Sequence, residues 1–105
     1  MTKSIRSLMV LAALVSMAGA VGFAQSSGEA TYKAKCAMCH GPTGAAETPT
    51  AKMLKVLPAS DPAIKALTID QIIATIKNGK GKMHPVTGLT DPQIKDVATF
   101  YHGLK

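Results

Sequence analysis

The sequence predicts an all-α protein of three to five short helices, and three observations support this fold class. The isoleucines between residues 69 and 76 recur at i, i+3, i+4 and i+7, which is the spacing of one face of a helix. Thr90 and Gln93 have the spacing of a helix-capping box. The residues around the two cysteines contain no run of strand-forming residues. At 105 residues, the chain has the length of one domain.

The first expected helix covers about residues 28–39. Gly28, Tyr32 and Cys36 fall at i, i+4 and i+8, so they share one face of this helix. A glycine in a helix costs stability, and its benefit here would be the close approach of another helix. We therefore expect the first and last helices to cross at Gly28.

The remaining helices are expected at four places. Short helical turns are expected near residues 50–57 and directly after the Ser-Asp-Pro sequence at 60–62. A longer helix begins after Thr68, follows the isoleucine pattern and ends at the Asn-Gly pair 78–79. The last helix covers about residues 91–103. Its apolar side consists of Ile94, Val97, Tyr101 and Leu104, with Phe100 beside them.

The first 24 residues have the pattern of a secretory signal peptide. A positively charged start precedes an apolar run over residues 8–15, and small residues lead to a cleavage site after Ala24. Cleavage after Ala20 also fits. A membrane anchor is disfavoured because the apolar run is shorter than the roughly 20 residues that a span needs. We predict a periplasmic protein with residues 1–24 as signal peptide, residues 25–105 as its domain, and no stable membrane insertion of the mature chain.

The mature chain would have a thin protein core. Loss of Lys3 and Arg6 lowers the formal net charge from +6 to +4, and the aromatic residues left are Tyr32, Phe100 and Tyr101. A chain this small buries little apolar surface, so we expect a disulfide, a metal or a large apolar cofactor to stabilise it. The modest charge, the export and the lack of interleaved basic and aromatic residues argue against nucleic-acid binding.

The segment 36–40, Cys-Ala-Met-Cys-His, points to a specific cofactor. Cys-x-x-Cys-His is the attachment signature of c-type haem, in which the two thiols add to the two vinyl groups. Cys36 and Cys39 are three positions apart, so on a helical turn both sulfurs lie on one side, and His40 continues the turn toward the iron. A thioredoxin-like redox site would need a βαβ context, and a zinc site would need more ligands at paired spacing. The sequence offers neither.

An iron held by His40 needs a second axial ligand. Methionine sulfur is a soft, neutral ligand that stabilises ferrous iron, and we predict that Met83 fills this role. Met83 lies in a loop with two glycines and a proline, which has the length to fold over the other face of the ring. His84 and Met53 are the alternatives, and Met38 lies inside the attachment turn. We expect His84 at the loop surface and Met53 packed under the cofactor.

Three blocks of the sequence resemble the small class I (monohaem) c-type cytochromes, the soluble bacterial electron carriers. The blocks are residues 28–41, 78–83 and 89–100, and the resemblance covers essentially all of 27–105. The family commonly has proline directly after the methionine, where this chain has a histidine. The resemblance implies a cytochrome c fold over residues 25–105, with short helices wrapped around one covalently attached haem c and with crossing terminal helices.

Electron transfer is the function that these residues imply. A haem with both axial positions filled has no open site for substrate, so we expect no enzyme activity. Lysines near the haem edge would attract redox proteins with acidic docking surfaces. We predict a monomeric single-electron carrier between respiratory or photosynthetic partners. The alternative is a cytochrome c subunit bound to one dehydrogenase or oxidase complex. The lysines are Lys77, Lys80 and Lys82 near Met83, with Lys33, Lys35, Lys52 and Lys55 near other rims.

Overall fold

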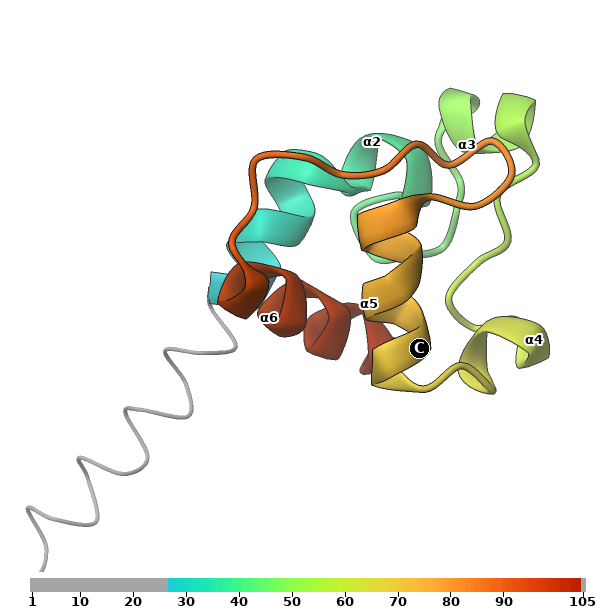
Figure 1. Cartoon of the computed structure of the whole chain (residues 1–105). Helices are drawn as coiled ribbons and strands as arrows, with labels where there is room; N and C mark the ends of the chain where they lie inside the picture. Colours follow the sequence, from blue (N-terminus) through green and yellow to red (C-terminus); the bar gives the residue numbers. More distant parts are fainter. Residues whose placement is uncertain (1–26, 105) are drawn as a thin grey trace, which may run out of the picture.

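The computed structural model describes residues 27–104, and this part of the chain is helical (Figure 1). Residues 27–35 form the first helix, which is followed by α2 (Ala37–His40), α3 (Pro49–Leu54), α4 (Pro62–Lys65), α5 (Ile69–Asn78) and α6 (Asp91–His102). The all-α prediction is confirmed. The predicted signal peptide and its cleavage sites lie outside the described residues. Within residues 27–104, no helix is long and apolar enough to cross a membrane.

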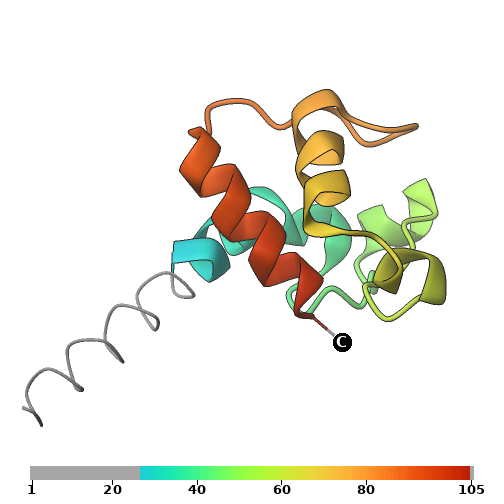
Figure 2. The same ribbon diagram turned by 60° about the horizontal axis from the view of Figure 1, so that its bottom comes forward.

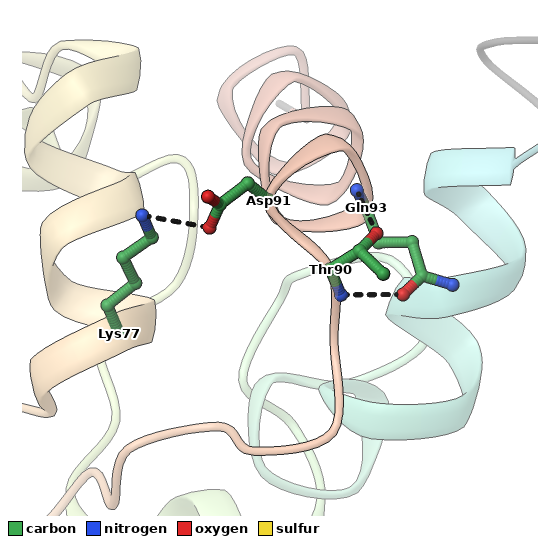
Figure 3. A network of polar contacts seen from close by, with 4 residues as sticks. All are labelled: Lys77, Thr90, Asp91 and Gln93. Atoms are coloured by element: carbon green, nitrogen blue, oxygen red, sulfur yellow. Dashed lines mark hydrogen bonds and ion pairs between the residues drawn. The ribbon is translucent and has the colours of Figure 1, made fainter.

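Local sequence determines where the helices α5 and α6 begin. The side chain of Thr90 accepts a hydrogen bond from the backbone N–H of Gln93, whose side chain accepts one from the backbone N–H of Thr90 (Figure 3). Thr68 and Gln71 form the same pair of bonds at the start of α5. Each box satisfies N–H groups that the first helical turn leaves without partners. The predicted starts of both helices are confirmed.

The short helices α3 and α4 confirm the two predicted helical turns. Each has a proline in its first turn, where a missing N–H has no cost. The side chain of Thr48 caps α3 by accepting from Ala51 N, and the carboxylate of Asp61 caps α4 by accepting from Ala63 N. Lys55, directly after α3, caps the helix and adopts a left-handed conformation with φ 57°.

The expected single helix over 28–39 is interrupted at Cys36. The backbone N–H of Cys36 still donates to the oxygen of Tyr32, but φ of Cys36 is −119°. The oxygen of Cys36 then accepts from both Cys39 N and His40 N, at 3.2 and 3.0 Å. A bond to the third residue tightens the turn, so the attachment segment forms α2 instead of continuing the first helix.

The first helix and α6 cross at Gly28, as predicted (Figures 1 and 2). A Cβ atom at Gly28 would lie 2.5 Å from the backbone oxygen of Asp96, so a larger residue would push the helices apart. The buried side chains of this region belong to the first helix, α5 and α6. They are Tyr32, Ile72, Ile76, Ile94, Val97 and Ala98.

The helices α5 and α6 pack against each other through their isoleucine and valine faces. At one end of this contact, Lys77 and Asp91 form an ion pair with an N–O distance of 3.1 Å (Figure 3). Exposed ion pairs contribute about 0–1 kcal/mol, whereas burying one large aliphatic side chain contributes about 1.5–3 kcal/mol. Apolar packing therefore holds the two helices together.

Candidate functional site

Three of the four predicted site residues line one cavity of about 190 Å³. Cys36 and His40 come from the attachment segment, and Met83 comes from the loop between α5 and α6. Cys39 is half-buried and is not among the lining residues. The walls are mostly apolar. The lining residues are Tyr32, Cys36, His40, Ile64, Leu67, Ile72, Thr75, Ile76, Lys80, Met83, Val97 and Tyr101.

His40 has the features of a metal-binding imidazole. Burial lowers the pKa of His40, which favours the neutral ring, the form that coordinates metals. Its Nδ1 atom is buried and has no hydrogen-bond partner within the described chain. The ring meets Tyr101 of α6 edge-on, with the ring centroids 5.4 Å apart. The imidazole is therefore held by packing, while its Nδ1 atom has no hydrogen-bond partner within the described chain.

The two cysteines are free thiols in this structure, and both are half-buried. Burial raises the pKa of the Cys36 thiol, and the neighbouring Cys39 adds to this effect. Cys36 therefore favours the neutral thiol over the thiolate. Two neighbouring thiols, of which Cys36 lines the cavity, are the groups that addition to two vinyl groups requires.

Backbone geometry positions Met83. Lys80 and Met83 exchange two backbone hydrogen bonds, of 3.0 and 2.9 Å, which close a tight turn. Gly79, at φ 75°, lies so close to this turn that a Cβ atom there would be 2.6 Å from the oxygen of Met83. The backbone N–H of Val86 donates to the oxygen of Ile76 at 2.9 Å, which joins the far side of the loop to α5.

The alternative ligands His84 and Met53 do not line the cavity, and neither does Met38. Met38 and Met53 are 77% and 72% exposed. The expectation that Met53 packs under the cofactor is wrong, because Ala51 is the buried residue of α3. A residue two positions later on a helix points to nearly the opposite side. His84 is exposed, as predicted, whereas Met83 is half-buried.

Sequence reasoning missed several lining residues that periodicity could have identified. Thr75 lies three positions after Ile72, on the same side of α5, so a helical wheel places it at the cavity. Ile64 lies in α4 and Leu67 lies just after it, and both are half-buried apolar residues. Lys80, which was predicted to lie near Met83, also lines the cavity, and its backbone pairing with Met83 holds it there.

The residues present fit a haem better than an isolated metal ion. Mostly apolar walls suit a porphyrin ring, and an unengaged imidazole and a thioether are the two ligand types that its iron accepts. A protein-held ion such as zinc would need several ligands at one point. Within the described residues, no three His, Cys, Asp or Glu side chains come together in this way.

Comparison with known proteins agrees with this chemistry. No curated protein matches the chain. The family model for cytochrome C oxidase, cbb3-type, subunit III matches residues 23–100, which include Cys36, Cys39, His40 and Met83. The match also includes every residue that lines the cavity except Tyr101. The chain therefore belongs to this family, as a small monohaem c-type cytochrome that carries covalently bound haem c and transfers electrons through its iron.

Proposed function

We propose that this chain is a periplasmic single-electron carrier, with its haem attached through Cys36 and Cys39 and the iron coordinated by His40 and Met83. The observation that best supports this proposal is the shared cavity, which brings Cys36, His40 and Met83 together from distant parts of the sequence. When bound, the haem supplies an iron centre that changes its oxidation state by one electron.

The protein's own residues would then set the properties of the site. His40 provides a neutral imidazole, and Met83 provides a soft sulfur that favours the ferrous state and raises the reduction potential. With both ligands in place, no coordination position is left open for a substrate. Ile72, Ile76 and Val97 exclude water from the wall, which lowers the local dielectric constant and strengthens electrostatic effects on the iron.

Lysines around the cavity favour the binding of an acidic partner. Lys80 and Lys82 lie in the turn that Lys80 and Met83 close, and both are exposed. Lys77 is paired with Asp91 and Lys33 with Glu29, so these two lysines have nearby carboxylates that reduce their effect. We propose that Lys80 and Lys82 attract redox proteins with acidic docking surfaces, in encounters that weaken at high ionic strength.

We also propose that residues 1–24 are removed on export and that residues 25–105 remain as a monomer without membrane insertion. The charged start, the apolar run and the small residues before Gln25 support this boundary. Mass spectrometry of periplasmic material should find an N-terminus at or near Gln25. An intact Met1 together with detergent-dependent solubility would identify residues 1–24 as an anchor.

The second candidate function is a subunit that passes electrons within one dehydrogenase or oxidase complex. The description of the matching family, which names an oxidase subunit, favours this candidate. Purification of the native protein separates the two functions. A free carrier should elute alone as a monomer, whereas a bound subunit should bring a second polypeptide with it at constant ratio.

Covalent attachment is the direct test of the haem assignment. Haem should stay with the wild-type polypeptide through acid-acetone extraction, and Cys36→Ala or Cys39→Ala should abolish or strongly reduce holoprotein formation. Met38→Ala is the matched control, because Met38 lies between the cysteines and is exposed. That variant should retain its haem. Quantitative recovery of free haem from the wild-type protein would contradict the assignment.

A further inference from the structure

Tyr32 has a buried hydroxyl that is bonded to the residue next to His40. The side chain is 1% exposed, and its hydroxyl donates to the backbone oxygen of Gly41 at 2.6 Å. Both residues that this hydrogen bond joins, Tyr32 and Gly41, are buried. A buried hydroxyl without a partner is costly, so this bond fixes where the hydroxyl and the Gly41 peptide lie.

The Gly41 peptide is the point where the chain leaves the attachment segment. Gly41 adopts φ 85°, a conformation that favours glycine, and its oxygen also accepts from Gly44 N at 3.2 Å. Just before it, the oxygen of His40 accepts from Ala46 N at 2.9 Å. Backbone bonds therefore hold the turn after His40, and Tyr32 adds the side-chain bond that ties this turn to the first helix.

Tyr32 also supports the ring that touches His40. Its own ring stacks on Tyr101 with the centroids 6.2 Å apart, and Tyr101 in turn meets the edge of the His40 imidazole. Within the described chain, the buried Nδ1 of His40 has no hydrogen-bond partner that could orient the ring. The direction of the imidazole therefore depends on the backbone that follows it and on the Tyr101 ring, and Tyr32 contacts both.

We propose that Tyr32 is a positioning residue for the iron ligand His40: its hydroxyl, through the Gly41 peptide, fixes the orientation of the imidazole. This inference rests on the proposed role of His40 as an iron ligand. It goes beyond packing, because the hydroxyl could be removed while the ring keeps its contacts with Phe100 and Tyr101. A purely structural role would affect stability alone, whereas a positioning role would also affect the electronic structure of the iron.

The test compares two variants of the haem-loaded protein. Tyr32→Phe removes the hydroxyl and keeps the ring. Phe100→Leu removes an aromatic ring whose centroid lies 5.3 Å from that of the Tyr32 ring, and it keeps the hydrogen bond from the Tyr32 hydroxyl. The electron paramagnetic resonance spectrum of the oxidised protein reports the orientation of the axial imidazole. We expect Tyr32→Phe to shift the g values and the reduction potential, and Phe100→Leu to lower the melting temperature while leaving the g values unchanged.

The outcomes separate this inference from the proposed function. Unchanged g values and potential in Tyr32→Phe, with wild type showing His and Met ligation, would overturn the positioning role and leave the proposed function intact. A wild-type spectrum without histidine ligation would overturn both. If Tyr32→Phe yields no holoprotein, nuclear magnetic resonance of the wild type replaces it. The Tyr32 hydroxyl proton should then be protected from exchange by its bond to the Gly41 oxygen, and a rapidly exchanging hydroxyl would contradict the inference.

Discussion

The two predicted iron ligands lie in regions of the molecule that are held in different ways. His40 follows the first helix and is surrounded by side chains, with Tyr101 against its ring and Tyr32 bonded to the next peptide. Met83 lies in a loop whose neighbours Lys82 and His84 are exposed, and backbone hydrogen bonds hold its turn. A glycine at positive φ and backbone hydrogen bonds hold the turn on each side, and the histidine side is held in addition by the side chains of Tyr32 and Tyr101. The two sides should respond to different substitutions.

Loss of the haem should have the largest effect on stability, because both regions would contact it. The described core relies on a few aliphatic residues and on Tyr32, so little apolar packing remains between the histidine and methionine sides without the cofactor. We expect a chain with both Cys36→Ala and Cys39→Ala to lack a cooperative thermal transition by circular dichroism. A cooperative melt close to that of the holoprotein would show that the two sides hold together unaided.

Substitution of Gly79 should affect the methionine side. At φ 75°, an alanine is strained, and its Cβ would lie 2.6 Å from the oxygen of Met83. We expect Gly79→Ala to lower the free energy of unfolding by about 2–4 kcal/mol and to weaken the sulfur-to-iron absorption band. Gly81→Ala is the control, since Gly81 also has positive φ but open space around it. It should cost about 1–2 kcal/mol and leave the band in place.

High pH should affect the histidine side. Burial raises the pKa of Tyr32 from 10.0 to about 12, with Tyr101 and Cys36 adding smaller effects. The folded protein therefore holds this proton more tightly than the unfolded chain does. The stabilisation is fully present below pH 10 and is lost as the pH rises through about 12, a total of about 2–3 kcal/mol. Denaturant unfolding at several pH values should show the free energy of unfolding falling as the pH rises through this range. Tyr32→Phe should reduce that fall. An equal fall in the variant would contradict the role given to Tyr32.

A smaller effect is expected at the helix crossing. A Cβ at Gly28 would meet the backbone of Asp96, which must shift to accept it. The better helix propensity of alanine offsets part of this clash, so we expect Gly28→Ala to lower the free energy of unfolding by about 1–2 kcal/mol. Because Gly28 is on the histidine side, the sulfur-to-iron band should persist. Loss of the band in this variant would show that the two sides are coupled.

The contrast between the two sides also explains what the sequence could predict. Capping boxes and helical periodicity are local, so α5 and α6 were predicted correctly. The crossing at Gly28 was predicted because a glycine in a helix allows close approach of another helix. The attachment motif is local as well, and it identified the cofactor. The break of the helix at Cys36, the bond from Tyr32 to Gly41 and the exposure of Met53 depend on tertiary contacts. Spacing along one helix carries no information about such contacts.

The ligation of the iron by His40 and Met83 is tested most directly by the absorption spectrum of the oxidised protein. The weak long-wavelength band from sulfur to iron should be present in wild type and should persist in His84→Ala, because His84 is exposed. Met83→Ala should lose the band and show a lower reduction potential. A wild-type protein without the band, in which His84→Ala opens the iron to exogenous ligands, would contradict the assignment and identify His84 as the second ligand.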